Sequence, residues 1–435
     1  MNVERVIGDM FKRFGHVFFA LAVALTILMT GTLGHARSAP WAKGGTSRPE
    51  DLQVKLVTFG PGSDMASWFG HTAIAVEDTR LNVRRIYNYG MFSADPAMVA
   101  KYVMGRLEFW VAPTPYGRTL QMYADEDRDV RLLTINVAPD KRAAMAEFLE
   151  DNIRPENRMY LYHHYYDNCA TRIRDVFDLA TDGQFKTYGT KTPSRMSLRD
   201  HTRRHAQWDS IDYGMMYAMS EAIDAPITAW DEMFLPEELE GHVKSFKYLN
   251  DDGELVPLAG EEEVYAKAQN REPTPDEPSL LWPKLLLLGV LTSLVGAALG
   301  AFHVKKKTRL SRVLFGLYQA GVGLGFGGFG VLLLGMWVLT DHTVTYQNEN
   351  LFWTNPVTFL VFFTGFGVAL GRDVALTRLD KVWKACAVIA VAGQVLKLLP
   401  WLNQDTSLTV ALCAPVVFGM ALVTHKVKQM MDEAA

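Results

Sequence analysis

Cys169 is the residue of this 435-residue chain whose type and position are best suited to covalent chemistry. The other two cysteines, Cys386 and Cys413, lie in long apolar stretches, so Cys169 has no partner for an intrachain disulfide in the polar part of the chain. Asp167 or Asn168 suits an N-cap, which places Cys169 in the first turn of a predicted helix. The N–H groups and dipole of a helix start lower a thiol pKa and can stabilise an oxyanion, which favours acyl transfer. A buried, inert cysteine is the alternative on local grounds.

The base that such a thiol needs is predicted to be His71. It follows a Ser-Trp-Phe-Gly loop and begins a predicted strand, where an imidazole can accept the thiol proton and later return it. Asn88 lies on the next predicted strand, which pairs with that of His71 as a hairpin, and its amide could fix the imidazole tautomer. A structural histidine and an ordinary strand-edge asparagine are the alternatives. His163 and His164 are nearer to Cys169 in sequence, but they lie in a tyrosine-rich run and are expected to pack like aromatic residues.

The elements that must position these residues follow from hydrophobic periodicity and turn residues. Together they predict an α+β domain with an antiparallel sheet over residues 53–270, preceded by a linker over 37–52, with mixed helix and loop over 190–265. Strands are expected near 54–58, 71–77, 85–90 and 130–137, and helices near 96–104, 139–153 and 169–183.

The chain becomes almost wholly apolar after Pro283, which predicts an all-α membrane domain of five helices over 283–428. Glycines recur in the second stretch, as is typical of helices that pack closely in lipid. The stretches are 285–304, 313–340, 351–370, 382–400 and 406–425.

Loop charges give the orientation of these stretches. Positive residues mark the cytoplasmic side of a membrane. They follow the first, third and fifth stretches, whereas 341–350 and 401–406 contain no Lys or Arg. The positive residues are Lys305, Lys306, Lys307, Arg309, Arg312, Arg372, Arg378, Lys381, Lys426 and Lys428. The polar domain is therefore predicted to lie in the periplasm of a bacterium, on a multi-pass protein of the inner membrane.

A further apolar stretch, Val17 to Leu33, follows three basic residues near the start of the chain. Residues 1–36 are either a transmembrane anchor or a signal peptide, since Gly34-His35-Ala36 resembles a cleavage site. Both interpretations export the domain that follows. The net charge of −4 and the absence of a basic stripe interleaved with aromatic residues exclude a nucleic-acid partner. Nothing in the sequence calls for a cofactor or a metal ion.

Taken in order, a strand histidine, a paired strand and a cysteine that opens a helix resemble the circularly permuted papain-like fold, with histidine first as in lecithin:retinol acyltransferase-like enzymes. More closely, T-F-G-P-G-S-D-M-A-S-W-F-G-H-T-A-I-A-V, Y-N-Y-G-M-F and Y-Y-D-N-C-A-T-R-I-R-D resemble the Lnb-type lipoprotein N-acyltransferases. Later segments, P-S-R-M-S-L-R-D, Q-W-D-S-I-D-Y-G and M-F-L-P-E-E-L, also fit, so the resemblance spans about 53–265.

The resemblance implies an acyl chain taken from a membrane phospholipid through a cysteine thioester and passed to the α-amino group of a lipoprotein's lipid-modified N-terminal cysteine. Position by position, Cys169 would be the nucleophile and His71 the base. Asn88 is a less secure third member, because that member varies among permuted papain-like folds. The partners implied are a phospholipid donor and a diacylated lipoprotein acceptor.

Four further residues are candidates for substrate binding. Arg172 and Arg174 lie about one turn beyond the cysteine and could meet a lipid phosphate, with helix-surface salt bridges as the alternative. Met215 and Met219 belong to a methionine cluster that could line an acyl-chain groove, with ordinary core packing as the alternative.

Two other functions remain open on the residues alone. The same dyad could serve a membrane-anchored periplasmic hydrolase, either a phospholipase or a cell-wall amidase or peptidase, because a Cys–His pair does not distinguish water from an amine. The domain could also be a non-catalytic scaffold that binds lipid or lipoprotein.

Overall fold

The computed structural model describes residues 38–93 and 97–433, so the predicted apolar stretch at 17–33 lies outside the described residues. The chain divides into two compact units. The first comprises Met1–Met196 with Pro226–Pro275, and the second comprises Ser197–Ala225 with Asp276–Ala435. The sequence predicted one polar domain over 53–270. The structure instead groups residues 197–225 with the C-terminal helices.

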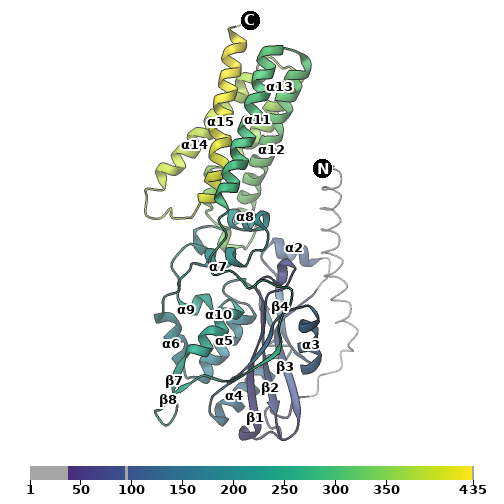
Figure 1. Ribbon diagram of the computed structural model, residues 1–435, viewed down its shortest axis with the longest axis vertical. Helices are drawn as coiled ribbons and strands as arrows, with labels where there is room; N and C mark the ends of the chain where they lie inside the picture. Colours follow the sequence, from purple (N-terminus) through teal and green to yellow (C-terminus); the bar gives the residue numbers. More distant parts are fainter. Residues whose placement is uncertain (1–37, 94–96, 434–435) are drawn as a thin grey trace. The chain divides into compact units, whose positions relative to one another are not determined.

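A seven-stranded antiparallel sheet forms the centre of the first unit (Figure 1), with strand order β6-β4-β3-β2-β1-β5-β9. The predicted hairpin is confirmed, since β2 and β3 pair with Ile74 opposite Tyr87. The strands are β1 (Leu52–Phe59), β2 (His71–Asp78), β3 (Val83–Phe92), β4 (Glu108–Thr114), β5 (Val130–Ile135), β6 (Met159–Leu161) and β9 (Ala259–Ala266), with β7 (Lys247–Leu249) and β8 (Leu255–Pro257) in a separate two-stranded sheet.

Helices cover both faces of this sheet, and alternate strand residues supply the two cores. One face carries Leu56, Ile74 and Tyr87 towards a core shared with α4 and α5. The other carries Val57 and Ala73 towards a smaller core shared with α3. Figure 1 shows α3 on one side of the sheet and α5 on the other. The helices of this unit are α2 (Ala97–Val103), α3 (Tyr116–Asp125), α4 (Pro139–Asn152), α5 (Cys169–Ala180), α6 (Gln184–Lys191), α9 (Ala229–Glu232) and α10 (Pro236–Ser245).

The segment before β1 was predicted to be a linker, and its described part is instead packed into the first unit. Ala39 and Trp41 are buried in the main core. The indole N–H of Trp41 donates to the Tyr87 hydroxyl at 2.7 Å, and Tyr87 in turn bonds to the carboxylate of Glu150 on α4. Gly, Ser and Pro around these residues suggest a linker, whereas one tryptophan with a hydrogen-bond partner is enough to hold the segment in place.

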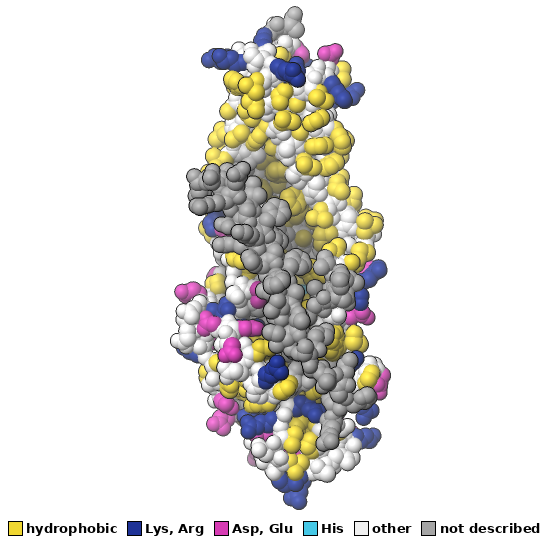
Figure 2. Space-filling view, turned by 90° about the vertical axis from the view of Figure 1, so that its right-hand side faces the viewer, with side chains coloured by type: hydrophobic (Ala, Val, Ile, Leu, Met, Phe, Trp, Pro, Cys, Tyr) yellow, Lys and Arg dark blue, Asp and Glu magenta, His cyan; other side chains and the backbone are white. Residues whose placement is uncertain are grey.

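The second unit holds five helices: α11 (Trp282–Lys306), α12 (Arg309–Leu339), α13 (Phe359–Leu370), α14 (Ala375–Leu396) and α15 (Ser407–Asp432). Among the described residues, α11, α12 and α15 are long and apolar enough to cross a membrane. A fourth candidate is the pair Thr343–Phe352 and Pro356–Leu370, which is bent by 57°. The structure thus supports a helical membrane bundle, and the number of five spans stays a prediction. Figure 2 shows hydrophobic side chains over the flank of the bundle and Lys and Arg side chains at one end of it.

Close packing of α12 on α13 bears out the expectation from the glycine pattern only in part, because a Cβ at Gly321, Gly325 or Gly328 would meet nothing within 4 Å. A Cβ at Gly316 would lie 2.4 Å from the backbone nitrogen of Ala369, and one at Gly365 would lie 2.6 Å from that of Ala320. Real Cβ atoms do not approach backbone so closely, so these positions need glycine for the two backbones to meet.

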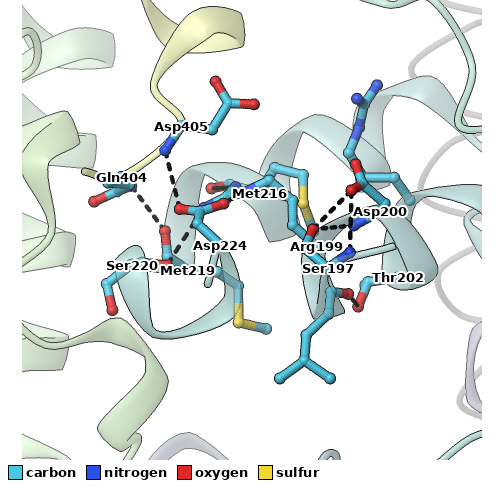
Figure 3. A network of polar contacts seen from close by, with 12 residues as sticks. Ser197, Arg199, Asp200, Thr202, Met216, Met219, Ser220, Asp224, Gln404 and Asp405 are labelled. Atoms are coloured by element: carbon cyan, nitrogen blue, oxygen red, sulfur yellow. Dashed lines mark hydrogen bonds and ion pairs between the residues drawn. The ribbon is translucent and has the colours of Figure 1, made fainter. Parts of the chain in front are cut away.

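Residues 197–225 are joined to the loops of the helical bundle by a polar network (Figure 3). They form α7 (Leu198–His205), α8 (Asp209–Ala218) and a short turn. Arg199 pairs with Asp224, whose carboxylate also accepts the backbone N–H of Asp405 at 2.9 Å. Gln404 donates to the Met219 carbonyl at 2.9 Å. These bonds explain why a segment from the middle of the predicted polar domain belongs to the second unit.

The packing of Trp41 gives a first prediction. Trp41→Ala should lower the unfolding free energy of the first unit by about 3–5 kcal/mol, because it removes a buried ring and leaves the Tyr87 hydroxyl without its donor. Trp41→Phe should cost less. The measurement is thermal unfolding of the purified full-length protein, with the exposed Lys43→Ala as control. An unchanged melting temperature for Trp41→Ala would mean that the segment is a free linker.

Candidate active site

Cys169 is the first residue of α5, and Asn168 is the N-cap of that helix, as predicted. The Asn168 side-chain oxygen accepts the N–H groups of Ala170 at 2.9 Å and Thr171 at 3.0 Å. Its side-chain nitrogen donates to the carbonyls of His164 and Phe234. Asn168 is buried, and the bonds of its side chain fix the helix start to two neighbouring loops, so the position of Cys169 is closely determined.

The sulfur of Cys169 meets the start of β2. The backbone N–H of Thr72 lies near this sulfur and lowers the thiol pKa, and Thr72 is the residue after His71. The Thr72 hydroxyl donates to the Val57 carbonyl at 2.9 Å, which anchors this end of β2 to β1. The fold thus brings the thiol beside the strand residue that follows the predicted base.

His71 and Asn88 are in direct contact across the β2–β3 hairpin. The His71 Nε2 atom lies 2.9 Å from Asn88 Oδ1, which also accepts the backbone N–H of Gly90 at 2.8 Å. Because a backbone N–H only donates, the Asn88 atom at this point is oxygen, and His71 Nε2 must carry a hydrogen. The neutral imidazole therefore keeps its lone pair on Nδ1, where it can accept a proton. Asn88 thus bonds to His71 as predicted, and its role in the reaction stays a prediction.

Gly90 leaves the space that the imidazole occupies. A Cβ at this position would lie 2.6 Å from His71 Cε1 and 3.2 Å from both His71 Nε2 and Asn88 Oδ1. The His71 ring could not stay in this position if residue 90 carried a side chain. Sequence reasoning quoted this glycine within Y-N-Y-G but gave it no role, because the close approach is a property of the paired strands.

Burial makes both members of the pair neutral in the resting state. It raises the pKa of the Cys169 thiol to about 11, although the N–H groups of Thr72, Ala170 and Cys169 and the charge of Arg128 act in the opposite direction. Burial, followed by Arg128, lowers the pKa of His71 to about 4, against the hydrogen bond that His71 donates to Asn88. The prediction that the helix start lowers the thiol pKa was therefore wrong in its net result. The N–H groups act as expected, but loss of solvent outweighs them.

Aromatic rings surround the pair. The ring of Tyr123 stacks on Phe59 with centroids 3.7 Å apart, and its centroid lies 6.0 Å from that of His71. Burial raises the pKa of Tyr123 to about 12, and the pKa values of Tyr160 and Tyr162 are also raised, first by burial and then by their proximity to Cys169. Near neutral pH these hydroxyls stay protonated; that of Tyr160 donates to the Tyr89 carbonyl, and that of Tyr162 lies 3.3 Å from His164 Nδ1.

His163 and His164 both lie against aromatic rings. The His164 ring packs edge-on against Phe69 and Phe234, with centroids 4.5 Å and 5.4 Å away, and burial lowers its pKa to about 4. The His163 ring stacks on Tyr166. Both histidines pack among aromatic residues, as expected.

The four residues predicted to bind substrate make contacts with protein groups or lie in the second unit. Arg172 makes a two-bond ion pair with Asp167 at 2.6 and 2.7 Å. Arg174 donates to the Trp230 carbonyl at 2.7 Å and lies over the Trp230 ring. Met215 and Met219 belong to the second unit, at the end of α8. Roles of these four residues in lipid binding stay predictions.

One group of side chains in the described part of the chain could hold a metal ion. Ligand atoms of Glu232, Glu238 and His242 lie within 4.8 Å of one another. His242 Nε2 is 2.6 Å from Glu232, and its Nδ1 is 3.0 Å from the Tyr188 hydroxyl. Hydrogen bonds of His242 with Glu232 and Tyr188 account for its position without a metal.

Comparison with known proteins supports the predicted resemblance. The family model described as the Lnb N-terminal periplasmic domain matches residues 39–204, which include Cys169, His71 and Asn88. No curated protein and no solved structure matches the chain. The matched segment is similar to the Lnb N-terminal periplasmic domain, and the apolar helices of the second unit are compatible with a membrane protein.

The raised thiol pKa predicts an unusual alkylation profile. Because the thiolate reacts and the thiol pKa is about 11, the rate of Cys169 alkylation by iodoacetamide should rise about tenfold per pH unit from pH 8 to pH 10. The rate constant is measured on the Cys169 peptide by mass spectrometry, with Cys169→Ser as the blank. A plateau reached below pH 8 would contradict the pKa given by burial.

Proposed function

We propose that this Lnb-family membrane protein is a lipoprotein N-acyltransferase. It takes an acyl chain from a phospholipid through a Cys169 thioester and transfers it to the α-amino group of the lipid-modified N-terminal cysteine of a lipoprotein. The observation that carries the proposal is the bond from His71 Nε2 to Asn88, because it leaves Nδ1 as a proton acceptor in a site where a cysteine opens a helix. The domain match adds the class of protein.

In the first half of the cycle, the Cys169 proton moves to His71 Nδ1 as the sulfur attacks the ester carbonyl of the phospholipid. A C–S bond forms, and the carbonyl oxygen takes the negative charge beside the N–H groups of the helix start. When the tetrahedral centre collapses, the C–O bond breaks and His71 returns its proton to the departing oxygen. The products are an acyl-thioester on Cys169 and a lysophospholipid.

In the second half, the neutral α-amine of the lipoprotein attacks the thioester carbonyl. His71 accepts a proton from the nitrogen and delivers it to the Cys169 sulfur as the C–S bond breaks, so the thiol is regenerated. An amide has formed, and no external oxidant or reductant is needed. A low His71 pKa keeps the imidazole in its basic, neutral form at the start of each half.

A membrane anchor suits this reaction. Donor and acceptor both carry acyl chains and stay in the bilayer, so a domain on the same chain as membrane helices meets them at a high effective concentration. Acyl transfer and hydrolysis differ only in whether an amine or water attacks the thioester. Hydrolysis is therefore one of the outcomes that the test below distinguishes.

The nucleophile gives the direct test of this proposal. In a strain without other N-acyltransferases, Cys169→Ser and Cys169→Ala should abolish N-acylation of lipoproteins, because neither side chain forms a thioester. The measurement is mass spectrometry of lipoprotein N-terminal peptides. Full N-acylation in Cys169→Ala would overturn the proposal, and release of free fatty acid without N-acylation would indicate a hydrolase.

Gly90 gives a test of the geometry. Gly90→Ala should reduce the rate of N-acylation by about 100-fold, because the new methyl group displaces the imidazole from its hydrogen bond with Asn88. The matched control is Gly117→Ala on α3, where a Cβ meets nothing within 4 Å. Both variants are compared for rate and for melting temperature. Equal rates for Gly90→Ala and the wild type would contradict the assignment of His71 as the base.

A further inference from the structure

Arg128 is a buried cation that neither the sequence motifs nor the cycle above uses. It lies between α3 and β5 and is 4% exposed. Its Nε atom donates to the Gly60 carbonyl at 2.8 Å, and Nη1 lies 3.4 Å from the carboxylate of Glu126. Its Nη2 atom is buried without a hydrogen-bond partner. Burying a donor of a charged group without a hydrogen-bond partner costs folding free energy. A functional role of Arg128 would explain why this cost is tolerated.

The guanidinium lies against the aromatic layer behind the Cys–His pair. Its central carbon is 4.6 Å from the centroid of the Tyr123 ring. Tyr123 stacks on Phe59 and faces His71, and Gly60, which accepts the Nε bond, follows Phe59 at the end of β1. Arg128 thus contacts Tyr123, which faces the imidazole, and Gly60, which follows Phe59, a second ring that stacks near the imidazole.

We propose that Arg128 is an electrostatic positioning residue, whose fixed charge stabilises the negative charge that forms on the Cys169 sulfur and holds His71 in its neutral form. The proposal rests on the proposed function only in taking Cys169 as the nucleophile. Arg128 acts through the thiol and the imidazole, and its charge is worth more here than at the surface because little water screens it.

Other groups around the pair do not cancel this charge. Glu126 is half-exposed and therefore well screened. Tyr123, Tyr160 and Tyr162 face the thiol with raised pKa values, so they are neutral near pH 7. The ion pair of Arg172 with Asp167, near the start of α5, has no net charge.

The direction of the effect is the same for both members of the pair. Arg128 lowers the pKa of Cys169 and also that of His71. The charge therefore favours the thiolate and opposes the imidazolium. The state that it favours most has a deprotonated sulfur and a neutral imidazole. In the acyl-transfer cycle, the charge of Arg128 stabilises the anionic tetrahedral centre. It also favours transfer of the proton from His71 to the departing oxygen.

The test compares Arg128→Gln, which removes the charge but can still donate to Gly60, with Arg128→Lys, which keeps the charge. We expect alkylation of Cys169 by iodoacetamide at pH 8 to slow by about tenfold in Arg128→Gln, equivalent to one pKa unit, and by less than about threefold in Arg128→Lys. The control is Arg118→Gln, which removes an exposed arginine from α3. The rate is measured on the full-length protein, with melting temperature as the check on folding.

The acid limb of the pH profile gives a second readout that a purely structural role would not move. In Arg128→Gln the acid limb of kcat/KM for acyl transfer should shift to higher pH, because His71 regains basicity. A folded Arg128→Gln protein that is alkylated at the wild-type rate overturns the proposal. If Arg128→Gln does not fold, the result for Arg128→Lys tests the proposal. This variant keeps the charge, so alkylation slowed by tenfold or more in it would also overturn the proposal. Alkylation needs neither donor nor acceptor, so its result is independent of whether acyl transfer occurs.

Discussion

The candidate site depends on the packing of α5 against β2, which places the backbone N–H of Thr72 near the sulfur of Cys169. It joins the start of β2 to the start of α5, two points almost one hundred residues apart in the sequence. Asn168 holds the helix start from one side, and the pairing of β2 with β1 and β3 holds the strand from the other. The thiol and the imidazole are therefore carried by elements of regular structure, Cys169 at the first turn of α5 and His71 at the start of β2, where the imidazole bonds to Asn88.

The surroundings of this contact determine how the site can work. Burial disfavours charge on both the sulfur and the imidazole, so the resting pair is a neutral thiol and a neutral base. A preformed thiolate would react with any electrophile in the periplasm. In the proposed cycle the proton leaves the thiol only as the acyl carbonyl arrives, when the N–H groups of the helix start and the charge of Arg128 stabilise the developing anion.

Much of the site was predictable because its residues lie at element boundaries with strong local signals. Asn168 before Cys169 has the composition of an N-cap, and the hairpin of His71 and Asn88 follows from alternating apolar residues around a turn. Arg128 and Gly90 were assigned no role because their contacts are with residues from other strands and helices. The thiol pKa was predicted in the wrong direction, since a sequence shows the helix start but not the depth of burial. Strand β9 was missed because A-G-E-E-E-V-Y-A contains three consecutive glutamates and is mostly exposed, and only its pairing with β5 makes it a strand.

The same limit applies to the boundary between the units. Residues 197–225 have a polar, mixed composition, and only the bonds of Arg199, Asp224, Met219 and Gln404 assign them to the unit of the membrane helices. For function, the central claim is a covalent one, that Cys169 carries the acyl chain. The most direct measurement is acid-quenched mass spectrometry of the purified full-length protein after incubation with phospholipid alone. The account predicts a hydroxylamine-sensitive acyl adduct on the Cys169 peptide, which disappears when lipoprotein is added. An adduct that persists in Cys169→Ala, or lipoprotein N-acylation with no adduct on Cys169 at any time, would contradict it.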